Sequence, residues 1–155
     1  PIMVRWPGKV KPAIYDTLVS SIDIAPTIYA ACGVKAPAGL PGINLLDVCR
    51  HREENPSAAD KRNVLFGESF AHDIANINRP AESLIFRWCI RGQWKLLLTY
   101  DGKVGRYAFT HLRSNRKPQL YNLLEDPHEN KNLADSNPEI VKQLTKLIEE
   151  SWDGK

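Results

Sequence analysis

The spacing of apolar residues changes from a helical to a strand period along this chain of 155 residues. Between residues 23 and 32 apolar side chains recur at helical spacing, at Ile24, Ile28 and Ala31. This spacing predicts a helix whose first turn Asp23 can cap and which Gly33 can end. Pro26 fits that first turn, because its missing N–H has no intrahelical partner there to lose.

A strand period follows from residue 84 onward. The segments 84–91 and 94–100 alternate on either side of Gly92-Gln93, which predicts an antiparallel hairpin. One face of this hairpin is rich in aromatic residues and consists of Leu84, Phe86, Trp88 and Ile90. We expect that face to be buried and the opposite face, with Arg87 and Arg91, to be solvated. Two arginines on one face could alternatively bind an anion.

Two shorter strands and a helix complete the second half of the chain. The strands are predicted at 64–66 and 119–122. The helix follows Asn137 as N-cap and Pro138 as first helical residue. One face of this helix is apolar, with Ile140, Val141, Leu144, Leu147 and Ile148. A sheet covered by such an amphipathic helix makes a small α+β unit.

The first part of the chain is less regular. The apolar run Ile2–Trp6 is typical of the end of a strand buried on both faces in a parallel α/β sheet. Residues 34–63 are rich in Pro, Gly and charge and indicate a connector, with a short helical turn at 45–49. Since the sequence starts at Pro1 and runs at once into that apolar strand, we expect it to be a piece whose upstream part is missing.

Composition excludes several classes of protein. Hydrophobic residues make up 43% and charged residues 25%, as in ordinary globular domains. The net charge of +3 is too small to indicate a nucleic-acid partner. No apolar run approaches the roughly 20 residues of a membrane helix, so no membrane partner is expected. The 3 cysteines have no C-x-x-C spacing, which indicates neither a disulfide framework nor a zinc site.

One dense polar group follows the strand predicted at 64–66. It contains Glu68, His72 and Asp73, and a loop at a strand end can present such side chains to a ligand. Together they could recognise sugar hydroxyls or an anion, with His72 changing charge near neutral pH. The alternative is a solvated loop in which His72 hydrogen-bonds Asp73 or the backbone.

Five stretches of the chain, in this order and spacing, carry a resemblance to a known family. They are Pro1–Lys9, Leu18–Thr27 with its Asp23-Ile24-Ala25-Pro26-Thr27, Leu40–Leu45, Arg91–Leu96 and Leu120–Leu133. Together they resemble the C-terminal part of a sulfatase of the arylsulfatase family, within the alkaline phosphatase-like superfamily. The resemblance covers nearly the whole chain, although each motif alone is weak.

The resemblance implies an α+β architecture in three parts. Residues 1–48 would be the C-terminal edge of the alkaline phosphatase-like α/β domain, and 49–63 a connector. Residues 64–155 would form a small antiparallel sheet packed against a C-terminal helix. It also suggests a periplasmic or secreted location.

The same resemblance implies chemistry that this chain does not itself contain. Such enzymes hydrolyse sulfate esters with a formylglycine, made from Cys or Ser in a C/S-x-P/A-x-R motif, beside a calcium ion. None of the cysteines begins that motif, so the nucleophile and the metal carboxylates are expected on a missing N-terminal domain. The chain alone is predicted to be inactive.

What the resemblance leaves for this chain is substrate recognition. In relatives the small domain lends a loop to the sulfate pocket, and the matching stretch here is 67–73. His72, Glu68 and Asp73 would then contact a sulfated sugar or an aryl sulfate. The alternatives are a free-standing module that binds a carbohydrate or an anion, and part of a related phosphoester or phosphonate hydrolase.

Overall fold

The computed structural model describes residues 1–50, 62–72, 75–100 and 117–152. The chain divides into two compact units, Pro1–Leu65 and Phe66–Lys155, which are described separately below. Most of the connector predicted at 49–63 lies outside the described residues.

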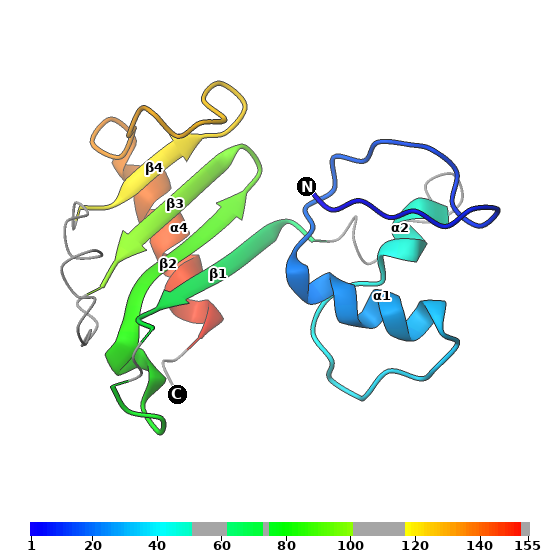
Figure 1. Ribbon diagram of the computed structural model, residues 1–155. Coiled ribbons are helices and arrows are strands. Elements are labelled where there is room, and N and C mark those ends of the chain that lie inside the picture. Colours follow the sequence, from blue (N-terminus) through cyan, green and yellow to red (C-terminus); the bar gives the residue numbers. More distant parts are fainter. Residues whose placement is uncertain (51–61, 73–74, 101–116, 153–155) are drawn as a thin grey trace. The chain divides into compact units, whose positions relative to one another are not determined.

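The described residues of the first unit contain three short helices, η1 Ser21–Asp23, α1 Ile24–Ala31 and α2 Leu45–Arg50; α1 and α2 are labelled in Figure 1. The helix predicted from the apolar spacing is confirmed as α1, and the short turn predicted at 45–49 is confirmed as α2. Gly33, at φ 67°, ends α1 as expected. The turn is closed by two backbone bonds, Gly33 N–H to Ala30 O at 3.2 Å and Val34 N–H to Tyr29 O at 3.0 Å.

Asp23 has a different role from the predicted cap of the first turn of α1. Its side chain is fully buried and makes no cap bond to α1. The carboxylate instead accepts backbone N–H bonds from Ser20 at 2.7 Å and Ile43 at 2.9 Å. It also forms an ion pair with Arg62 at 2.7 Å. A buried carboxylate needs such partners. The Ser20 bond is part of a capping box that begins η1, whereas Ile43 and Arg62 lie too far along the chain for a local capping rule to find them.

The strand predicted at Ile2–Trp6 does not form. A strand requires a hydrogen-bonded neighbour, and no strand is present in residues 1–50 of the first unit. Ile2 and Val4 pack instead against Leu45 and Val48 of α2. The apolar run is therefore used for packing without a sheet.

The second unit is a sheet of four strands in the order β1-β2-β3-β4, with a helix across one face (Figure 1). The elements are β1 Val64–Phe70, β2 Leu84–Arg91, β3 Trp94–Thr99, β4 Gln119–Asn122 and α4 Pro138–Ser151. β2, β3 and β4 pair antiparallel, with Cys89 opposite Leu96 and Leu96 opposite Leu120. This confirms the predicted small antiparallel sheet with a C-terminal helix.

The helix covers the face of the sheet that the alternation assigned to solvent. Cys89, Leu96 and Leu120 on this face are fully buried beneath α4, whose Leu144 and Ile148 are 3% and 1% exposed. Arg87 shares the face and is only 5% exposed, so its predicted solvated position is wrong. Both sides of the 84–91 segment carry apolar residues, and alternation alone therefore cannot tell which side the helix covers.

Trp88 lies on the opposite face, over β1. Its indole sits against Gly67, where a β-carbon would overlap the ring. The Lys95 ammonium lies 5.8 Å from the centre of the same ring and pairs with Glu129 at 2.6 Å. Gly67 is therefore needed for close approach rather than for a special backbone angle.

The loop after β4 forms hydrogen bonds with the backbone at the outer edge of that strand. Asn132 Oδ1 accepts the N–H groups of Leu120 and Ala134, both at 3.0 Å. The Leu120 carbonyl accepts the N–H of Leu133 at 2.8 Å. One side chain therefore satisfies two backbone donors, which protects an edge strand.

Candidate functional site

The polar group predicted after 64–66 sits at the end of β1. This strand is longer than predicted and runs to Phe70, so Glu68 is a strand residue and not a loop residue. His72 follows the strand and is exposed. Asp73 lies outside the described residues. We call Glu68–His72 the β1-end segment.

Ser83 anchors the chain on both sides of His72. Its carbonyl accepts the N–H of Ala71 at 2.7 Å, and its hydroxyl accepts the N–H of Ala75 at 2.8 Å. Ser83 itself is 1% exposed and immediately precedes β2. Since these bonds hold the backbone at two points, His72 is presented from a fixed base.

Glu68 lies beside a buried guanidinium. Its Oε1 is 3.8 Å from Arg87 Nε, and its side chain is 30% exposed whereas that of Arg87 is 7% exposed. Arg87 Nη2 donates to Ser151 Oγ at 3.0 Å. Within the described part of the chain Arg87 Nε has no hydrogen-bond partner, so the Glu68 carboxylate compensates the charge of a desolvated cation without a close hydrogen bond.

Aromatic contacts complete this group. The Trp152 ring lies 5.4 Å below the Arg87 guanidinium carbon, a cation–π contact. Trp152 also meets Phe70 edge to face, with centroids 5.9 Å apart at 78°. The sequence alone does not indicate that Arg87 and Trp152 lie near Glu68, because these contacts depend on the pairing of β1 with β2 and on where α4 ends.

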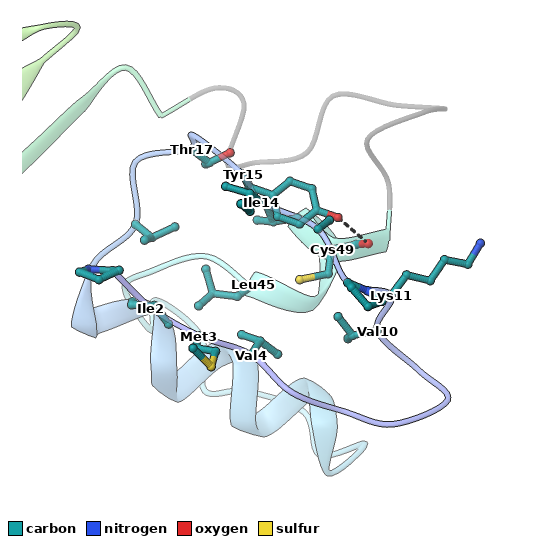
Figure 2. Close-up of a pocket in the computed structure, with 15 residues that line it drawn as sticks. Ile2, Met3, Val4, Val10, Lys11, Ile14, Tyr15, Thr17, Leu45 and Cys49 are labelled. Atoms are coloured by element: carbon teal, nitrogen blue, oxygen red, sulfur yellow. Dashed lines mark hydrogen bonds between the residues drawn. The ribbon is translucent and has the colours of Figure 1, made fainter. Parts of the chain in front are cut away.

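An apolar hollow of about 570 Å³ lies within the first unit (Figure 2). Its walls come from the N-terminal segment and from α2, and include Ile2, Val4, Leu45 and Val48. Tyr15 Oη donates to the Cys49 carbonyl at 3.2 Å (Figure 2). Neither Glu68 nor His72 lines this hollow, so it is separate from the polar group predicted as the site.

The three cysteines differ in exposure, with Cys32 exposed and Cys49 half-buried. Cys89 is fully buried, and burial raises its pKa to about 11. Burial also raises the pKa of Cys49. Among the residues that the structure describes, no three His, Cys, Asp or Glu side chains gather into a metal site. None of the three cysteines begins the formylglycine motif, and the described residues hold no cluster of ligands for the calcium ion that the resemblance implies.

None of the helices described here is both long enough and apolar enough to cross a membrane.

An antiparallel four-stranded sheet backed by a C-terminal helix, following an α-helical edge, defines the C-terminal part of an alkaline phosphatase-like sulfatase. The chain belongs to the family described as N-sulphoglucosamine sulphohydrolase, C-terminal, which matches residues 1–153. The sulfatase resemblance is thereby confirmed.

Curated relatives are sulfatases that are much longer than this chain. An N-acetylgalactosamine-6-O-sulfatase of Bacteroides thetaiotaomicron is 31% identical over 150 residues, which cover 96% of this chain and 26% of the relative. Human arylsulfatase A is 26% identical over 161 residues, which cover 95% of this chain and 29% of the relative. The chain thus spans less than a third of the length of these relatives.

Solved structures support the same fold. One from the Bacteroides thetaiotaomicron locus for metabolism of multiple glycosaminoglycans has a TM-score of 0.57 and 28% identity, covering 95% of this chain and 28% of that chain. Another was solved with its substrate D-glucosamine-2-N,6-O-disulfate; its TM-score is 0.59 at 21% identity, covering 95% of this chain and 26% of that one. These matches do not favour the free-standing module or the phosphoester hydrolase.

Proposed function

We propose that this chain contributes substrate recognition to a sulfatase that hydrolyses the sulfate esters of sugars. The observation that carries the proposal is the β1-end segment, in which Ser83 fixes the backbone around the exposed His72. Membership of the sulfatase C-terminal family supplies the class of reaction. His72 and Glu68, with Asp73 next in sequence, would exchange hydrogen bonds with the sugar.

The reactive groups belong to the part of the enzyme upstream of this chain. The formylglycine would supply the nucleophilic oxygen, and calcium would offset the charge of the sulfate. This assignment is supported by the sulfatase relatives, of whose length the chain spans less than a third. The chain's own groups then hold the substrate without breaking the S–O bond.

A sulfated sugar is favoured over an aryl sulfate as the substrate. Support comes from the relative named for N-acetylgalactosamine 6-O-sulfate and from the fold relative solved with a disulfated glucosamine. A sugar also presents several hydroxyls, which suit the acceptors and donors of Glu68 and His72. An aryl sulfate offers few such groups.

The test measures sulfate release by the protein with its upstream part present. With N-acetylgalactosamine 6-sulfate as substrate, His72→Ala is expected to lower kcat/KM by roughly ten- to a hundredfold, the effect of losing a charged hydrogen bond. Ile77→Ala is the matched control, since Ile77 is exposed in the same loop. The 155-residue chain alone is expected to release no sulfate.

Three results would contradict the proposal. Sulfate release by the isolated chain would place the reactive groups within it. An unchanged kcat/KM in His72→Ala would contradict the recognition role of His72. A faster turnover of 4-nitrophenyl sulfate than of the sugar would contradict the preference for a sulfated sugar.

A further inference from the structure

Arg87 is a buried cation whose polar partners among the described residues lie at the end of α4 and in β1. Its residue exposure is 5%, and burying a guanidinium is costly unless its donors are matched. Ser151 Oγ takes one donor at 3.0 Å, and Glu68 lies 3.8 Å from another. Ser151 is the last residue of α4, whereas Glu68 belongs to the second half of β1. Arg87 therefore links the end of the helix to the end of the strand.

Trp152 makes a second link between the same two ends. It packs under the Arg87 guanidinium at 5.4 Å and against the Phe70 ring at 5.9 Å. Glu68 and Phe70 are two residues apart on one strand and so lie on the same face. Arg87 and Trp152 therefore contact both side chains, Glu68 and Phe70, that the β1-end segment has on this face.

We propose that Arg87 and Trp152 are positioning residues that fix the β1-end segment for substrate recognition. This inference rests on the proposed function, because it assigns to the segment the contact with a sulfated sugar. Arg87 and Trp152 do not touch the substrate in this scheme. They set the strand end from which His72 is presented, two residues beyond Phe70.

Direct binding of the sulfate group by Arg87 is a weaker explanation. A side chain that is 7% exposed beneath the end of α4 offers no surface large enough for a sulfate. Its cation also already faces the Glu68 carboxylate, which would repel an anion.

The test compares variants at Trp152 and Ser151 in the protein with its upstream part present. Trp152→Ala removes the ring beneath Arg87, whereas Trp152→Phe keeps an aromatic face there. The control is Lys146→Ala on α4, because the Lys146 side chain is 74% exposed and forms a surface ion pair with Glu150 at 3.7 Å. Ser151→Ala removes the Arg87 acceptor together with the hydroxyl's own bond to the Ile148 carbonyl within α4, and it provides a milder variant should Trp152→Ala fail to fold.

The expected result is a change in KM without a matching change in kcat. For N-acetylgalactosamine 6-sulfate, Trp152→Ala should raise KM about tenfold and leave kcat within about twofold, because remote positioning affects binding before the chemical step. Trp152→Phe should restore most of the affinity, Ser151→Ala should raise KM about twofold to threefold, and Lys146→Ala should change nothing. Thermal melting of each variant confirms that it is folded.

The positioning role and the proposed function fail in different ways. If His72→Ala raises KM but Trp152→Ala and Ser151→Ala do not, recognition stands and the positioning role is wrong. If Trp152→Ala raises KM but His72→Ala does not, the segment is not the substrate contact and both are wrong. A fall in kcat of the same size as the rise in KM in Trp152→Ala would indicate general damage and would also overturn the positioning role.

Discussion

Arg62 forms a bidentate ion pair with Asp23, in which Nη1 donates to Oδ2 and Nη2 donates to Oδ1, each at 2.7 Å. Two backbone N–H groups, from Ser20 and Ile43, bind the same carboxylate. The pair thus joins three stretches of the first unit that are distant in sequence. Its net contribution to stability depends on whether these bonds outweigh the cost of burial.

Acid should destabilise the first unit through Asp23. Burial alone would raise the pKa of this carboxyl, but the hydrogen bonds from Arg62, Ser20 and Ile43 outweigh burial and hold the pKa below its ordinary value of 3.8. A lowered folded pKa means that the stabilisation is complete above the ordinary value and is lost as the pH falls through the folded one. The free energy of unfolding should therefore drop below a pH of about 4.

Asp23→Asn tests this origin of the acid sensitivity. Removing one partner of a buried pair leaves Arg62 uncompensated and should cost about 3–5 kcal/mol at neutral pH, with a shallower loss in acid. Asp126→Asn is the control, since the pKa of Asp126 is also lowered, by N–H bonds from Lys131 and Asn130. Urea unfolding at several pH values would show the difference. If the steep loss of stability in acid persisted in Asp23→Asn and vanished in Asp126→Asn, the acid sensitivity would come from Asp126 and the prediction would be wrong.

Gly67→Ala should destabilise the second unit. A β-carbon at position 67 would overlap the Trp88 ring, so the indole must move off the strand. Overpacking of this kind typically costs about 1–3 kcal/mol. Chemical denaturation of Gly67→Ala, Trp88→Leu and the double variant gives the coupling between them. Additive effects in the double variant would show that the two residues do not collide.

Asn132→Ala should also weaken the sheet, at its other edge. The substitution leaves the N–H groups of Leu120 and Ala134 without their shared acceptor, at a cost of about 1–3 kcal/mol. Asn132→Asp retains an acceptor oxygen and is the matched control. Thermal unfolding monitored by circular dichroism would suffice, and an unaltered melting temperature in Asn132→Ala would refute the role assigned to this side chain.

Cysteine labelling should distinguish Cys32 from Cys89. Cys32 is exposed and Cys89 is buried, and burial raises the pKa of Cys89 to about 11. Because the thiolate is the reactive form, iodoacetamide at pH 8 should label Cys32 quickly and Cys89 only after α4 leaves the sheet. Mass spectrometry of timed samples gives both rates. Equal rates under native conditions would mean that the helix does not cover Cys89.

Local patterns predicted most of the elements. The period-two runs predicted β2 and β3, and a short strand was predicted where β4 lies. The Asn137-Pro138 start with its apolar face predicted α4. The helix at Ile24–Ala31 and its glycine stop followed from spacing in the same way. These signals lie within a few residues of the elements that they specify.

Long-range contacts were the part that local patterns could not supply. The face of β2 that the helix covers, and therefore the burial of Arg87, depends on which of two apolar sides meets Leu144 and Ile148. The run Ile2–Trp6 was predicted as a strand because a run of apolar residues does not indicate whether a neighbouring strand is present. Likewise Glu68 was found as a candidate from local polarity, but its proximity to Arg87 follows from tertiary structure alone.

The loop that follows β4 has a consequence for self-association. The backbone of Leu120 is engaged by Asn132 and Leu133, and the Asn122 carbonyl accepts the N–H of Asp126 at 2.8 Å. The backbone groups at the outer edge of β4 are already hydrogen-bonded within the chain, so a neighbouring molecule cannot extend the sheet by adding a strand there. Intermolecular β-pairing, the usual hazard of an antiparallel border, is thereby blocked beside β4 even in concentrated solution.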